Sequence, residues 1–252
     1  MPGFWLGTKR RGNSPRQNSC GDETMETACG RPRGGHMRHD GAHHQGLRPL
    51  DKEKAAVLAP VLSWAKTAAR YPKTADHMEA LLEHSEPLVH WLPQSLPLFQ
   101  DLLAGWIEAP EATLEAHQVD YTRLFVARWG GVPAPLYASW YLDQETFCGD
   151  GAEASVGFYE RWGLVWRETT LKEPPDHLAV ELEFLEILSR AVSEAPADGA
   201  QERLSPSALW LDFRLSHFDR WVPRCAEIMG RHAAQPVYKI LALSLTQLCE
   251  ED

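Results

Sequence analysis

The chain has 252 residues, is 44% hydrophobic and carries a formal net charge of −10. This length allows one large domain or two small ones with a sizeable core. No run approaches the ~20 apolar residues that span a bilayer, and no apolar segment follows the basic residues near the start, so we expect no stable membrane insertion and a cytoplasmic location. The acidic balance argues against nucleic-acid binding, because phosphate contacts need a cationic face.

Charge and composition divide the chain near residue 50. Residues 1–50 hold eight Lys/Arg and four Asp/Glu, are rich in Gly, Arg, Ser and His, and show no apolar period, which predicts a disordered basic segment. Residues 51–252 hold 17 Lys/Arg and 31 Asp/Glu, an acidic body suited to a cationic peptide. The five cysteines lack CxxC spacing, which indicates reduced thiols and neither a disulfide framework nor a zinc ribbon.

From Asp51 onward the apolar pattern is helical almost throughout, with no convincing alternating strand. Helix starts are indicated by capping residues or by proline at a first helical position. We expect a single all-α domain over 51–252 with about nine to eleven helices. The main predicted starts and stops are Asp51, Tyr71-Pro72, Thr74, Pro110, Gly163, Ser205-Pro206, Val222-Pro223 as a break, and Pro236.

Residues 129–137 read Trp-Gly-Gly-Val-Pro-Ala-Pro-Leu-Tyr and cannot form regular structure. The thirteen residues that begin with this loop, 129–141, include four aromatic side chains: Trp129, Tyr137, Trp140 and Tyr141. Considered individually, Trp140 or Tyr141 is more simply explained as a side chain packed in the hydrophobic core. The cluster as a whole, beside Gly and Pro, favours an exposed recognition surface.

The stretch from Pro174 through Asp176 and His177 to Glu181 opens a strongly apolar helix. Asp176 is a natural helix cap or first-turn acid, and His177 and Glu181 lie four apart, on one side of the first turn. The simplest interpretation is a capped helix whose His and Glu face solvent. The alternative is an acidic site beside an aromatic groove, which would hold a peptide with arginines followed by an apolar stretch.

The sequence supports a catalytic function less strongly than it supports peptide binding. Asp176, His177 and Glu181 could act as a base or as metal ligands in a metal-dependent hydrolase. Around these three residues, however, there is no HxxxH pair, and the chain has no GxSxG elbow and no phosphate-binding glycine loop. We therefore expect a binding protein and not an enzyme, with no cofactor, no metal site and no catalytic residue.

Taken together, several segments resemble the TorD/DmsD family of redox-enzyme maturation chaperones, most closely its DmsD branch. The resemblance covers roughly 51–252 and rests on Tyr121-Thr-Arg-Leu-Phe125, Trp129, Pro133-Ala-Pro135, Ser139-Trp-Tyr-Leu-Asp-Gln-Glu145, Pro175-Asp-His-Leu178, Glu181-Leu182, His217-Phe-x-x-Trp221 and Pro236-Val-Tyr238. The chain departs from the nearest relatives at Tyr137, where they carry Trp, and at Gln144, where they carry Arg.

The resemblance implies a cytoplasmic chaperone that binds the twin-arginine leader of a molybdopterin-containing oxidoreductase subunit and holds it for cofactor insertion before export. It implies leader contacts at Trp129, Pro135, Tyr137, Tyr141, Asp176 and His177, to which the aromatic and acidic patterns add Trp140 and Glu181. A NarJ-like assembly role for a client that is not exported is an alternative. A homodimer and the identity of the client are left open by the sequence.

Overall fold

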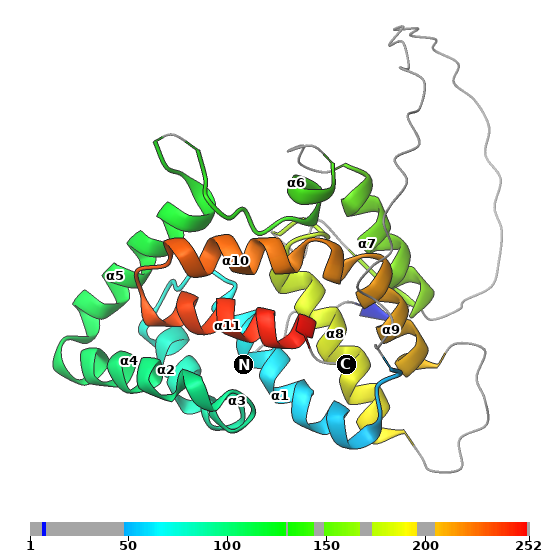
Figure 1. The fold of residues 1–252 in the computed structure, drawn as a ribbon, viewed down its shortest axis with the longest axis horizontal. Coiled ribbons are helices and arrows are strands. Elements are labelled where there is room, and N and C mark those ends of the chain that lie inside the picture. Colours follow the sequence, from blue (N-terminus) through cyan, green and yellow to red (C-terminus); the bar gives the residue numbers. More distant parts are fainter. Residues whose placement is uncertain are drawn as a thin grey trace, which may run out of the picture.

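The structure is a computed structural model that describes residues 48–129, 131–143, 149–166, 173–195 and 205–250, together with the backbone of residues 7–8. Within these residues it contains eleven α-helices (Figure 1). They are α1 (Lys52–Ala68), α2 (Ala75–Glu83), α3 (Glu86–Trp91), α4 (Leu96–Glu108), α5 (Pro110–Tyr121), α6 (Ala138–Leu142), α7 (Asp150–Arg161), α8 (Leu178–Glu194), α9 (Pro206–Ser216), α10 (Val222–His232) and α11 (Pro236–Glu250).

Short elements connect the helices. They are the 3-10 turns η1 (Pro93–Ser95) and η3 (Phe218–Arg220), the π-helical turn η2 (Thr122–Val126), and the antiparallel two-residue strands β1 (Gly7–Thr8) and β2 (Leu164–Val165). The predicted all-α class and the helix count are confirmed. No helix among the described residues combines the length and the apolar character needed to cross a membrane.

Most helices begin where local sequence chemistry predicts. Asp51 caps α1 by accepting a hydrogen bond from the Lys54 backbone N–H at 2.8 Å, and α5 starts at Pro110, whose fixed φ suits a first turn. One prediction was wrong. Val222-Pro223 does not break the helical region but opens α10, because proline is tolerated in the first turn of a helix.

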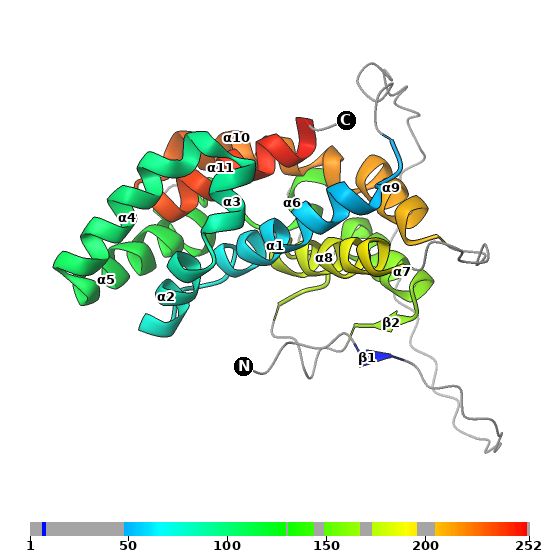
Figure 2. The same cartoon turned by 90° about the horizontal axis from the view of Figure 1, so that it is seen from below.

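Helix α8 lies at the centre of the molecule, with twelve of its 17 residues buried. It packs along α1 (Figure 2). Glu186 of α8 pairs with Lys66 of α1 at 2.5 Å, and Glu183 pairs with Arg70, two residues past the end of α1, at 3.0 Å. The α10–α11 hairpin packs against the other side of α1 and against α4. Helices α2 to α5 gather at one end of the molecule in both views.

Part of the predicted domain division lies outside the described residues. Most of the segment 1–50 falls there, and so do residues 144–148 and the predicted polar linker around 196–204. Within the described part, Leu50 is buried in the core, and its carbonyl accepts a hydrogen bond from the Ser207 hydroxyl. The helical body therefore includes Leu50.

Candidate functional site

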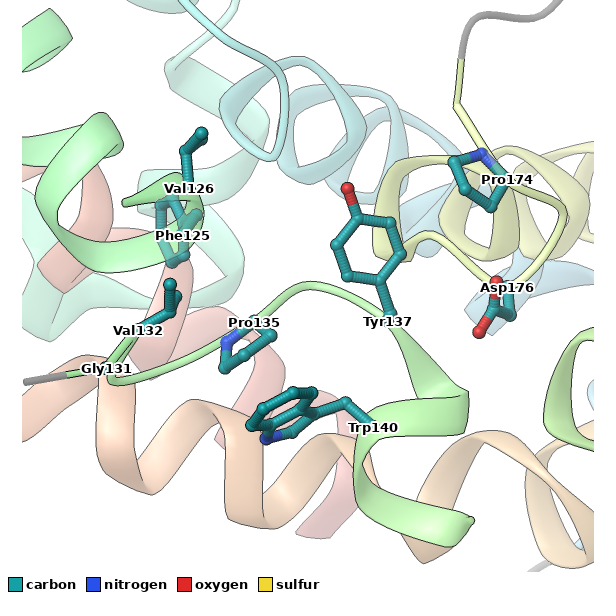
Figure 3. A pocket seen from close by; sticks show the side chains of 9 residues that line it. All are labelled: Phe125, Val126, Gly131, Val132, Pro135, Tyr137, Trp140, Pro174 and Asp176. Atoms are coloured by element: carbon teal, nitrogen blue, oxygen red, sulfur yellow. The ribbon is translucent and has the colours of Figure 1, made fainter. Parts of the chain in front are cut away.

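A pocket of about 610 Å³ lies between the end of η2, the loop that follows it and the segment that leads into α8 (Figure 3). Its wall is mostly apolar and aromatic. The lining residues are Phe125, Val126, Gly131, Val132, Pro135, Tyr137, Trp140, Pro174 and Asp176. Four of the predicted site residues, Pro135, Tyr137, Trp140 and Asp176, therefore share one cavity, in which Asp176 supplies the acidic side chain.

Backbone hydrogen bonds fix the loop that forms the pocket. The loop turns at Gly131, whose φ of 103° suits a residue without Cβ. The Ala134 N–H bonds to the Leu124 carbonyl at 3.1 Å, which folds the loop back onto η2. At its far end, Tyr137 forms an antiparallel bridge with His177, so the loop is held against the start of α8.

Asp176 ties α6 to the start of α8. Its Oδ2 accepts hydrogen bonds from the Ser139 backbone N–H at 3.0 Å and from the Ser139 hydroxyl at 2.6 Å. Asp176 therefore caps α6, a different helix from the α8 that the sequence suggested. Its other oxygen, Oδ1, is buried and has no hydrogen-bond partner among the described residues.

His177 is the actual cap of α8. Its Nδ1 accepts a hydrogen bond from the Ala179 backbone N–H at 3.1 Å, and its ring packs edge-on against Tyr137. Burial, with a smaller contribution from Arg70, lowers the pKa of His177 to about 3. The imidazole is therefore neutral near neutral pH, so it positions the pocket wall and does not tune binding in that range.

Glu181 lies in a separate buried network. Its Oε1 accepts hydrogen bonds from Ser155 at 3.0 Å and His217 at 2.7 Å, and its Oε2 accepts one from the Trp221 indole at 3.0 Å. Desolvation opposes protonation of His217, but the Glu181 carboxylate outweighs it and raises the His217 pKa. The expectation that Glu181 shares an accessible acidic surface with Asp176 is wrong, since the side chain is fully buried and both of its oxygens are occupied.

A family model described as nitrate reductase delta subunit matches residues 89–227, more than half of the chain. The chain belongs to this family. Its members are redox-enzyme maturation chaperones and not catalysts, so the predicted class and the predicted lack of enzymatic activity are confirmed.

A solved structure supports the fold of this maturation chaperone. A protein described as a redox enzyme maturation protein from Archaeoglobus fulgidus is 21% identical and matches with a TM-score of 0.51. The match covers 84% of this chain and 100% of that one. No curated protein sequence matches the chain.

Besides His177 and Glu181, two more predicted site residues of the chaperone lie outside the pocket wall. Trp129 is fully exposed on the loop, one residue before the described part is interrupted. Tyr141 is turned inward and stacks on Trp221, with ring centroids 5.5 Å apart. Tyr141 therefore packs α6 against the core, which is the alternative role that its sequence position also allowed.

Sequence reasoning missed the apolar part of the pocket wall. Phe125 and Val126 belong to the π turn η2, Val132 to the loop, and Pro174 to the segment before α8. Val126 is exposed although it follows the buried pair Leu124 and Phe125. An apolar residue that continues a buried pattern up to a Gly/Pro loop is the signal that could have identified this part of the wall.

The metal-dependent hydrolase alternative finds no ligand set in the described part of the chaperone. No group of three or more His, Cys, Asp and Glu side chains there could hold a metal ion. Asp176, His177 and Glu181 are close in sequence but engage Ser139, the Ala179 backbone and His217, respectively. Three side chains with separate buried partners do not converge on one ion.

Proposed function

We propose that this chaperone binds the twin-arginine leader of a molybdopterin-containing oxidoreductase subunit in the cytoplasm and holds it for cofactor insertion before export. The observation that carries the proposal is the Oδ1 atom of Asp176. This carboxylate oxygen is buried, lacks a hydrogen-bond partner among the described residues, and belongs to a side chain in the wall of an aromatic pocket. Buried polar atoms are normally paired, so a missing partner supports a ligand.

An arginine fits the chemistry of Asp176. A guanidinium donates charge-assisted hydrogen bonds to carboxylate oxygens, and such bonds are stronger than neutral ones. Oδ2 is already held by Ser139, which leaves Oδ1 for the ligand. The planar guanidinium and its methylene stem would also pack well on aromatic rings such as Tyr137 and Trp140.

The rest of the pocket suits the apolar stretch that follows the arginines. A volume of about 610 Å³ lies in the range of pockets that hold a compact ligand, so it would accommodate a few side chains and not a whole leader. Val126 and Trp129 are exposed beside this cavity on the same stretch of chain. We assign them to the continuing apolar residues of the leader, and we remove Glu181 from the proposed contact set.

The test is an Asp176→Asn variant titrated with fluorescently labelled leader peptides of molybdoenzyme subunits from the same genome. Asparagine can still accept the Ser139 hydrogen bonds, but it presents an amide to the pocket. A hydrogen bond to a charged group contributes about 1.5–3 kcal/mol, so we expect leader affinity to fall about tenfold or more. Fluorescence anisotropy gives the dissociation constant.

The matched control is Glu227→Gln, which removes one negative charge from an exposed side chain of α10. It should leave the affinity within about twofold, because exposed charges are screened by salt. Equal affinities of Asp176→Asn and the unsubstituted protein would remove Asp176 from the leader site.

The description of the matching family favours a second candidate, a NarJ-like assembly role on a client that is not exported. The two functions differ in what the ligand must contain. A twin-arginine reader should lose affinity when both arginines of the leader become lysines, because lysine cannot make a bidentate contact. Equal binding of arginine and lysine leaders, together with binding of a client N-terminus that lacks paired arginines, would support the NarJ-like role.

A further inference from the structure

The outer face of α4 exposes large apolar side chains. Leu96 is 45% exposed, Leu103 47% and Ile107 74%, whereas Phe99 and Leu102 of the same helix are buried against the body. Helix α4 is thus apolar on two sides, and only one of them faces the core. Large apolar side chains that are exposed together on one helix face can mark an interaction site.

The spacing of this exposed face is that of a coiled-coil seam. Leu96, Gln100, Leu103 and Ile107 are separated by four, three and four residues, which places them at successive d, a, d and a positions of a heptad. All four are exposed. A seam of this kind takes a second helix at a small crossing angle, with knobs packed into holes, and a polar residue at one a position helps to fix the register.

The stretch of chain that contains the α4 seam carries charge of one sign. Residues 74–122 contain nine Asp/Glu and no Lys or Arg. Four of these acids, Asp101, Glu108, Glu111 and Glu115, lie on α4 and α5 themselves and are exposed. Helices α2 to α5, which carry this stretch, lie together at one end of the molecule (Figures 1 and 2).

We propose that the α4 seam binds a cationic amphipathic helix of the client subunit, at a place separate from the leader pocket. The apolar seam supplies the hydrophobic contact, and the surrounding carboxylates select basic residues at the flanking heptad positions. The assignment of the helix to a client rests on the proposed function. The leader pocket and the α4 seam would then hold two segments of one immature protein.

Charge and pattern favour this occupant over the alternatives. A second copy would bring together two stretches that each hold nine Asp/Glu and no Lys or Arg, and anionic lipid would be repelled in the same way. The basic residues 1–50 of this chain have a suitable charge but no apolar period with which to fill a heptad seam. A separate helix that is both basic and amphipathic satisfies both requirements.

The first experiment uses a synthetic helix of about three heptads with Leu at the a and d positions and Lys at e and g. We expect the full-length chaperone to bind it saturably, more weakly as salt rises. A Leu103→Glu/Ile107→Glu double variant should bind about tenfold or more weakly. Val57→Glu is the matched control, because Val57 is 44% exposed but lies on α1 and not on α4. This variant should bind the peptide as the unsubstituted chain does.

Two control peptides separate the seam from general charge attraction. A version with Glu at e and g, and a Lys version with its Leu residues scrambled out of the heptad, should both bind poorly. Equal binding of the scrambled peptide, or unchanged binding by the double variant, would overturn the proposal. Two further results would overturn it. One is a concentration-dependent dimer in sedimentation velocity that the Ile107→Glu substitution dissociates. The other is binding at the seam of a peptide of residues 9–38 but not of the designed helix.

The client assignment is tested with overlapping peptides of the subunit whose leader occupies the pocket. Some of these peptides should lose binding in the Leu103→Glu/Ile107→Glu variant, and we expect them to be cationic and amphipathic. If no peptide of the subunit behaves in this way, the assignment of the helix to the client is overturned. Leader titrations on the same proteins keep the two proposals apart. The seam double variant should retain leader affinity, and Asp176→Asn should retain affinity for the designed helix.

Discussion

Asp176 and Glu181 lie five residues apart at the start of one helix, and both are fully buried carboxylates. Their surroundings differ. Glu181 accepts three hydrogen bonds, from Ser155, His217 and Trp221, and neither of its oxygens is left over. Asp176 uses one oxygen to cap α6, and its other oxygen has no hydrogen-bond partner in the part of the chain that the structure describes. The Asp176 side chain also lines the loop pocket.

This difference separates a structural acid from a candidate binding acid. A carboxylate whose oxygens already accept hydrogen bonds from the protein gains no further hydrogen bond from a ligand. Removal of that carboxylate leaves its hydrogen-bond donors buried without an acceptor. A carboxylate with one unpaired oxygen beside a cavity can gain a hydrogen bond when a donor arrives. Burial alone does not distinguish the two cases, because hydrogen-bond saturation is the property that differs.

The largest expected effect comes from removing the saturated acid. Glu181→Leu leaves the His217, Trp221 and Ser155 donors buried without their acceptor, so we expect the free energy of unfolding to fall by about 3–5 kcal/mol. Urea denaturation followed by tryptophan fluorescence measures it. The exposed ion-pair variant Glu227→Ala should cost less than about 1 kcal/mol. If both variants lost equally little, the Glu181 network would have no structural role.

A smaller loss is expected from removing the cap at Asp176. Asp176→Ala deletes the one oxygen that accepts both Ser139 hydrogen bonds, so it should lower the free energy of unfolding by about 1–2 kcal/mol. Asp176→Asn preserves an acceptor and should lose less than half of that amount in the same urea experiment. Equal destabilisation by Ala and Asn would mean that the cap does not stabilise α6. The comparison also explains why Asn is the cleaner probe of leader binding.

The smallest effect is a pH dependence at His177. The pKa of His177 is about 3 in the folded protein and about 6.5 when unfolded, so the unfolded state binds the proton first as the pH falls. The stability from neutral His177 is therefore present above pH 6.5 and is lost as the pH falls toward 3. Between pH 7 and 6 the unsubstituted chain should lose about 0.7 kcal/mol more than His177→Asn, which keeps a capping side chain but does not titrate.

Urea titrations at the two pH values test this difference. His77, whose pKa burial lowers to about 4, and His217, whose pKa is raised, titrate in both proteins and cancel in the comparison. Parallel stability curves would show that His177 is not held neutral, and the interpretation of its Nδ1 as the acceptor for the Ala179 N–H would fail with it.

Local chemistry in the sequence determined most of the helices of this protein. The Asp51 cap, the first-turn proline at Pro110 and the Ser205-Pro206 start all lie where helices begin, because capping and proline geometry act over a few residues. The same locality explains the missed helix α10. Val222-Pro223 is compatible with a break or a start, and the apolar spacing of Val222, Cys225, Ala226 and Met229 was the signal that favoured a start.

The sequence also placed the loop residues Pro135, Tyr137 and Trp140 and the segment at Asp176 in one candidate site, and they line one cavity. Only the tertiary structure decided that Glu181 and Tyr141 face the core while Oδ1 of Asp176 has no partner among the residues described. Helical periodicity fixes which side chains share a face, but not which distant elements cover that face. Ser139, His217 and Trp221 come from other parts of the chain, and their positions determine which of the two acids has all of its oxygens occupied.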